Sequence, residues 1–114
     1  MKGNFSLLII TVFLTIASST SAQQQPTKIP RIGFQLDAPA SSLASRIEAF
    51  RQGLRELGYI EGKNLVIEWR EAKDNFDRVR EMANELVGLN VDVIVSPGPT
   101  VTRALKEATS TIPI

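Results

Sequence analysis

VDVIVSPGPT, residues 91–100, is the most informative segment of the sequence for the fold. Four of its first five residues are β-branched and apolar, a run typical of a strand that helices cover on both faces of a parallel sheet. The next five supply two hydroxyls, two prolines and a glycine, and Pro99 suits the first position of a helix that we predict over residues 99–108. Such a helix directs free backbone N–H groups and the positive end of its dipole past the strand end, which favours an anionic or strongly hydrogen-bonding ligand.

A strand is predicted much earlier in the chain, where apolar and small or polar residues alternate. Ile32, Phe34 and Leu36 alternate with Gly33 and Gln35, and this period of two is the signature of a β-strand. Its apolar face requires a covering helix, which the following sequence supplies.

That helix follows a loop over residues 37–42. SRIE, residues 45–48, matches a capping box at its start, although Ser41 or Ser42 is an alternative cap one turn earlier. Gly58 is placed to end the helix in a left-handed conformation. The helix carries an apolar stripe at spacings of three and four, formed by Ile47, Phe50, Leu54 and Leu57.

The next predicted strand, residues 65–70, is polar on one face. Leu65, Ile67 and Trp69 share a face, so we expect Trp69 to pack there rather than to hold a ligand. The opposite face holds Val66, Glu68 and Arg70. A half-polar strand among apolar ones is most easily placed at the edge of the sheet.

Two further helices complete the pattern. Asp74 or Asn75 caps the first of them, which ends near residue 90. Its predicted core-facing residues are Phe76, Val79, Met82, Ala83, Leu86 and Val87. Those of the helix over residues 99–108 are Val101, Ala104, Leu105 and Ala108.

Three consecutive strand-then-helix units predict an α/β fold, a doubly wound parallel sheet with right-handed crossovers. With the half-polar strand at the edge, the strand order is 2-1-3, and residues 112–114 begin a fourth strand next to the third. Ligands of such sheets bind beyond the carboxyl ends of the strands, where the chain reverses direction. The candidate ligand-binding residues are therefore Asp37, Ser41, Ser42, Ser96, Gly98 and Thr100. For Ser96 and Thr100 a role in the turn or helix cap is equally compatible with the sequence.

Composition restricts the chemistry of this site. The 114 residues include 13 basic and 12 acidic side chains without long blocks of one sign, which argues against a nucleic-acid or polybasic membrane partner. The chain has no Cys and no His, so it lacks thiol nucleophiles, histidine bases and the usual ligands of zinc. We therefore expect no catalytic residues, no metal site and no cofactor.

The first 22 residues resemble a secretory signal peptide. Lys2 precedes an uncharged and mostly apolar run over residues 5–17, and small residues lead to a predicted cleavage after Ala22. At 13 residues the run is shorter than the roughly 20 needed to span a bilayer. Because no Cys lies near the cleavage site, we expect a soluble chain rather than a lipoprotein. Residues 23–28 are expected to form a flexible leader.

Several segments together resemble the amino-terminal lobe of periplasmic substrate-binding proteins of ABC transporters. They are residues 46–59 (RIEAFRQGLRELGY), 61–64 (EGKN), 67–68, 91–95 and 108–114. The resemblance extends from about residue 29 to residue 114, and it is to the subfamily that includes tryptophan- and tyrosine-type receptors.

This resemblance implies a non-enzymatic, monomeric two-lobed receptor that binds a small solute such as an amino acid and delivers it to a membrane permease. It implies a periplasmic location and a chain far longer than 114 residues, so we expect residues 29–114 to form only part of the first lobe. Relatives place ligand contacts in the loops after the strands. Where many carry a Gly-Thr-Pro type of turn, this chain has Pro97-Gly98-Pro99-Thr100.

Two alternatives to a receptor stay open on the sequence. One is an α/β enzyme or nucleotide-binding domain, but neither G-x-G-x-x-G nor G-x-x-x-x-G-K-[ST] occurs in the chain. The other is a truncated receptor that is inactive because half of its cleft is missing.

Overall fold

The computed structural model describes residues 28–114. The predicted signal peptide, residues 1–22, lies outside the described residues, as does the predicted leader apart from Lys28. Both stay predictions.

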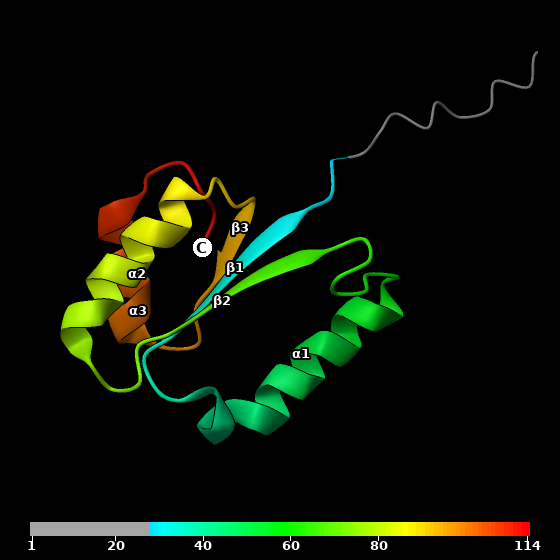
Figure 1. Ribbon diagram of the computed structural model, residues 1–114, viewed down its shortest axis with the longest axis horizontal. Helices are drawn as coiled ribbons and strands as arrows, with labels where there is room; N and C mark the ends of the chain where they lie inside the picture. The colour runs from blue at the N-terminus through cyan, green and yellow to red at the C-terminus, as the bar shows by residue number, and fades with distance from the viewer. Residues whose placement is uncertain (1–27) are drawn as a thin grey trace, which may run out of the picture.

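The described chain forms an α/β unit in which strands and helices alternate (Figure 1). Its three strands form one parallel sheet in the order β2-β1-β3. Helix α1 covers one face of this sheet, and α2 and α3 cover the other. The elements are β1 (Arg31–Leu36), the 3-10 helix η1 (Ala40–Leu43), α1 (Ala44–Glu56), β2 (Val66–Glu71), α2 (Phe76–Gly88), β3 (Val93–Val95) and α3 (Pro99–Ala108). The predicted fold class and the order of the first three strands are confirmed.

The last residues of the chain lie beside β3. The backbone N–H of Ile94 donates to the carbonyl of Pro113 at 2.9 Å. Within residues 28–114 no strand is assigned after β3, so the structure shows one backbone contact where a fourth strand was predicted.

Each face of the sheet has its own hydrophobic cluster. The cluster under α1 contains alternate residues of β1 and β2, and Trp69 packs at its margin as predicted. The cluster under α2 and α3 includes Leu86, Ile94 and Leu105, all of which are almost inaccessible to solvent. The core-facing stripes predicted for α2 and α3 are therefore confirmed, with one exception at the start of α2.

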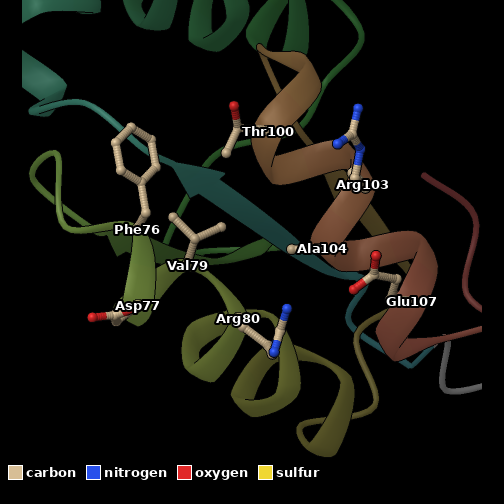
Figure 2. A pocket seen from close by; sticks show the side chains of 8 residues that line it. All are labelled: Phe76, Asp77, Val79, Arg80, Thr100, Arg103, Ala104 and Glu107. Atoms are coloured by element: carbon tan, nitrogen blue, oxygen red, sulfur yellow. The ribbon is translucent and has the colours of Figure 1, made fainter.

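That exception is Phe76, whose side chain is 65% exposed. It is the first residue of α2, and its ring stands beside the pointed end of β1 (Figure 2), whereas Val79 one turn later is buried. Helical periodicity predicted the correct face, but the first turn of α2 lies at the end of the sheet, where little remains to cover the ring.

The predicted cap of α1 is also wrong. Helix α1 begins at Ala44, directly after η1, and no side chain caps either helix. A capping serine normally has an extended backbone, but Leu43 precedes α1 with φ −120° and ψ 17°. Ser42 instead donates its hydroxyl to the carbonyl of Pro39 at 2.7 Å. Since η1 runs straight into α1, no serine is placed to fold back onto the first turn.

The other predicted helix ends are confirmed. The side chain of Asn75, one of the two predicted caps, accepts from the N–H of Asp77 at the start of α2. At the end of α1, Gly58 has φ +89°, and the N–H of Tyr59 donates to the carbonyl of Leu54 at 2.9 Å. This is the left-handed termination that glycine favours.

Candidate functional site

Three loops follow the carboxyl ends of the strands: residues 37–39, 72–75 and 96–98. In a parallel sheet all such ends lie at one edge. The register places Leu36 opposite Glu71 and Phe34 opposite Val95, so the three loops start close to the same level. This edge is the candidate site.

The loop after β1 is held by its own polar groups and by the end of β2. A carboxylate oxygen of Asp37 accepts from the N–H of Ala38 at 2.9 Å, and a carboxylate oxygen of Glu71 accepts from the N–H of Ala40 at 3.1 Å. Ser41 and Ser42 are exposed. Of the candidates in this loop, Asp37 is therefore partly engaged in shaping the turn.

The loop after β3 uses the hydroxyl of Ser96 to close the turn before α3. Ser96 donates to the carbonyl of Gly98 at 3.1 Å, and the hydroxyl of Thr102 lies 2.9 Å from that of Ser96. Thr100 is exposed, and its hydroxyl makes no hydrogen bond within residues 28–114. The structure thus gives Ser96 a structural partner and leaves Thr100 available to a ligand.

The start of α3 carries no side-chain cap. Gly98 occupies the capping position with an extended backbone, φ −150° and ψ 163°. Among the described residues, no carbonyl accepts from the N–H of Thr100 or of Val101. These groups and the helix dipole form a weak positive site at the edge of the sheet.

The six predicted residues do not line a single pocket in residues 28–114. Ser41 faces a hollow between α1 and β2, together with Trp69 and Glu71. Thr100 lines a different hollow of about 270 Å³ between α2 and α3. Figure 2 shows its lining residues, which are Phe76, Asp77, Val79, Arg80, Thr100, Arg103, Ala104 and Glu107. Asp37, Ser42, Ser96 and Gly98 line neither hollow, and the ligand-binding role of the six residues stays a prediction.

Sequence reasoning missed the loop after β2. Lys73 and Asp74 both have a left-handed backbone, with φ 51° and 64°, which is uncommon outside glycine. The N–H of Asp74 donates to the carbonyl of Asp37 at 2.6 Å, so this loop is tied to the loop after β1. Asp74 was a usable signal, because aspartate tolerates the left-handed conformation better than most residues. The sequence analysis considered Asp74 only as a helix cap.

No metal centre is apparent in the part of the chain that the structure describes. No three His, Cys, Asp or Glu side chains in it are grouped closely enough to hold an ion. A search of the same residues found no helix of the length and apolar character needed to span a membrane.

Comparison with known proteins supplies the family. Residues 36–114 match the sequence profile of a family described as ABC transporter substrate binding protein. The chain belongs to this family. No curated protein shows significant sequence similarity to the chain.

Two solved structures share the fold of this family member. One is a conserved domain protein from Vibrio cholerae, with 31% sequence identity and a TM-score of 0.71. The other is the ligand-free, open structure of a substrate-binding protein with adhesive properties from Clostridium difficile, with 21% identity and a TM-score of 0.70. Each comparison covers 75% of this chain and 29% of the solved chain. The chain therefore spans under a third of the length of these relatives.

Proposed function

We propose that this protein is the solute-binding component of an ABC import system, and that the described residues belong to its amino-terminal lobe. Family membership supports the solute-binding role. The observation that points to the place of binding is the uncapped start of α3, next to the loop after β1. The solute is a small molecule that carries a carboxylate, with amino acids as the preferred class. The tryptophan- and tyrosine-type receptors are the nearest functional analogues in this proposal.

In this proposal the backbone does much of the binding. The carboxylate of the solute meets the N–H of Thr100, and the hydroxyl of Thr100 donates a further hydrogen bond. Ser96 acts indirectly, because its hydroxyl already holds the turn. The loop over residues 37–42 forms the neighbouring wall, and a second lobe closes the cleft from the opposite side. The role is binding and delivery, without a catalytic step.

The proposal also covers location and partners. Removal of residues 1–22 releases a periplasmic receptor that acts as a monomer and docks on a membrane permease. A second lobe provides the opposing wall, so residues 1–114 alone should bind at least about a hundredfold more weakly than a two-lobed protein, roughly 3 kcal/mol.

Calorimetric titration of the two-lobed protein with a panel of amino acids tests the solute class. Thr100→Ala should weaken binding by about 1 to 2 kcal/mol, the contribution expected of one hydrogen bond to a charged group. Ser110→Ala, an exposed hydroxyl just beyond the other end of α3, is the matched control and should leave affinity unchanged. Absence of heat with every amino acid would remove this solute class.

Gly98 offers a sharper test of the place of binding. A Cβ added at Gly98 meets no heavy atom within 4 Å, and its backbone is one that any residue adopts. Gly98→Leu should therefore leave the melting temperature unchanged but block approach of the solute to the backbone. Gly88→Leu is the control, since Gly88 is equally unobstructed and lies at the far end of α2. Equal affinity in both variants would place the site elsewhere.

A further inference from the structure

One polar side chain lies in the hydrophobic interior between the sheet and helices α2 and α3. Gln35, on β1, is the single buried polar or charged residue in the part of the chain that the structure describes, and no part of it is exposed. Its amide nitrogen donates to the carbonyl of Val79 at 2.8 Å. Its amide oxygen is also buried and accepts no hydrogen bond within residues 28–114. A buried polar atom without a partner lowers the stability of a fold.

Stability therefore does not account for a glutamine at this position. Val79 belongs to α2, and in an α-helix its carbonyl also accepts from the N–H of Ala83. That carbonyl keeps a partner if the amide of Gln35 is removed. An apolar side chain of the same length would avoid the penalty of the unpaired oxygen, and such replacements can be neutral or stabilising. The role of Gln35 follows instead from what its amide holds in place.

The amide of Gln35 holds the first turn of α2 against the end of β1. Val79, which accepts its hydrogen bond, is the fourth residue of α2. A second contact lies just before this helix, where the N–H of Asp74 donates to the carbonyl of Asp37 at 2.6 Å. One contact is made by a buried side chain and the other by the backbone. The start of α2 is thus joined to the end of β1 at two points.

The first turn of α2 also forms one wall of the hollow that contains Thr100. Phe76 and Val79 line this hollow of about 270 Å³ from α2, and Thr100 lines it from α3 (Figure 2). A shift of the first turn of α2 would change the width of the hollow at Thr100. Thr100 is the residue proposed above to meet the carboxylate of the solute.

We propose that Gln35 is a positioning residue for solute binding, whose buried amide sets the distance between the start of α2 and the start of α3. Replacement of the amide by an apolar side chain leaves the fold intact but lets the first turn of α2 move, which weakens the contact between the hollow and the solute. This inference rests on the proposed function and adds to it a residue that does not touch the solute.

The test variant is Gln35→Met, since methionine keeps the length of the side chain and removes both polar atoms. Gln35→Leu is a second variant without polar atoms. Gln52→Met, at an exposed position on α1, is the matched control. Thermal melts report global stability, and we expect the melting temperature of both Gln35 variants to equal or exceed that of the natural protein.

Limited digestion of the full chain with trypsin reports the first turn of α2 and needs no solute. Arg80 and Arg103 are both exposed, and they are the fifth residues of α2 and α3 respectively. Cleavage after Arg103 therefore serves as an internal standard. In Gln35→Met, the rate of cleavage after Arg80 relative to that after Arg103 should rise at least about threefold, because local opening exposes the backbone to the protease.

Calorimetric titration of the two-lobed protein with the amino-acid panel measures the effect on the solute. We expect Gln35→Met to weaken binding about three- to thirtyfold, the range typical of residues that act on a site without touching its ligand. Gln52→Met should bind as the natural protein does.

Three results overturn the inference. A lower melting temperature in both Gln35 variants means that the amide serves stability. An unchanged ratio of Arg80 to Arg103 cleavage means that the amide does not hold the first turn of α2. Unchanged affinity together with a raised ratio means that this turn does not position the site. Absence of heat in the natural protein overturns the proposed function and with it the role of Gln35 in binding, while the digestion separately decides whether Gln35 holds the turn.

Discussion

The two faces of the sheet are packed in different ways. Under α2 and α3 the interior is aliphatic apart from Gln35, which is fully buried and donates from its side-chain amide to the carbonyl of Val79 at 2.8 Å. Ala83, Leu86, Val101 and Leu105 on this face are completely buried. Under α1, Ile47 is the one buried residue that the helix contributes. Two helices cover one face of the sheet and a single helix covers the other (Figure 1), and on the single-helix face further contacts lie at the margin of the core.

Aromatic and charged groups provide those contacts on the α1 face. The ring of Trp69 stacks on Phe34 with centroids 4.7 Å apart, and the guanidinium of Arg51 lies 4.7 Å from the Trp69 ring centre. The carboxylate of Glu61 accepts from Trp69 at 2.9 Å and from Arg51 at 3.1 Å. We therefore expect stability to be concentrated under α2 and α3, and the α1 face to lose less stability on single substitutions.

The largest effect should come from the centre of the aliphatic face. Leu86→Ala leaves a cavity among fully buried side chains and should lower the free energy of unfolding by about 2 to 5 kcal/mol. Leu57→Ala removes the same atoms from an exposed position and should change it by less than about 0.5 kcal/mol. Urea unfolding of the three proteins measures this. Similar losses in the two variants would show that burial in the structure does not predict stability.

Substitution of a glycine should lower the stability on one face of the sheet and raise it on the other. A Cβ at Gly33 lies 3.3 Å from both terminal methyls of Leu86, so Gly33→Val overpacks the aliphatic face and should cost about 1 to 3 kcal/mol. At Gly53, inside α1, an added Cβ meets nothing within 4 Å. Gly53→Ala should therefore stabilise the protein by about 0.5 to 1 kcal/mol. Thermal melts distinguish the signs, and stabilisation by both changes would mean that the two faces are packed alike.

Loosening of the α1 margin should be measurable without a large loss of stability. Glu61→Gln removes the charge facing Arg51 but keeps an acceptor for Trp69, and the two ion-paired side chains are 38% and 35% exposed. We expect a loss of less than about 1 kcal/mol that shrinks further at high salt. Trp69 is the only tryptophan, so its fluorescence reports this margin directly. Glu81→Gln, at an exposed position on α2, should leave the emission unchanged.

The smallest effect on stability should come from the titration of two surface carboxylates. A hydrogen bond from Arg55, together with its charge, lowers the pKa of Glu48 on α1. The backbone N–H of Arg31 and the charge of Lys28 lower the pKa of Asp92, which precedes β3. Both pKa values are lower in the folded state. The contributions of the two carboxyls to folding stability are therefore present above the unfolded pKa and are lost as pH falls through the folded pKa, below about pH 4.

Carboxyl chemical shifts followed by NMR as a function of pH check this prediction. Arg55→Gln should return the pKa of Glu48 toward its ordinary value without moving that of Asp92. If both carboxyls shifted together, the two sites would be coupled through the sheet rather than set by their local partners.

The strands and helices and their order could be predicted from the amino-acid sequence. The alternation at residues 32–36, the half-polar strand at residues 65–70, the apolar run at residues 91–95 and the helical stripes predicted three parallel strands, and the half-polar strand at the edge gave the order 2-1-3. The bounds of α3, Pro99–Ala108, match the prediction. These features follow from local periodicity and from the chemistry of proline and glycine, which act within a few residues. The family resemblance was carried by contiguous segments and is confirmed for the family, while the tryptophan and tyrosine subfamily stays a proposal.

The environment of individual side chains became clear only from the folded structure. Phe76 belongs to the predicted stripe but lies at the end of the sheet, where nothing buries it. Ser42 bonds to Pro39 because η1 runs into α1, and Ser96 is engaged because Thr102 approaches from the next turn. The loop after β2 joins the candidate site through a backbone contact between Asp74 and Asp37, two residues far apart in sequence. The burial and the hydrogen-bond partners of a side chain depend on where distant segments of the chain lie, and a local sequence pattern does not determine this.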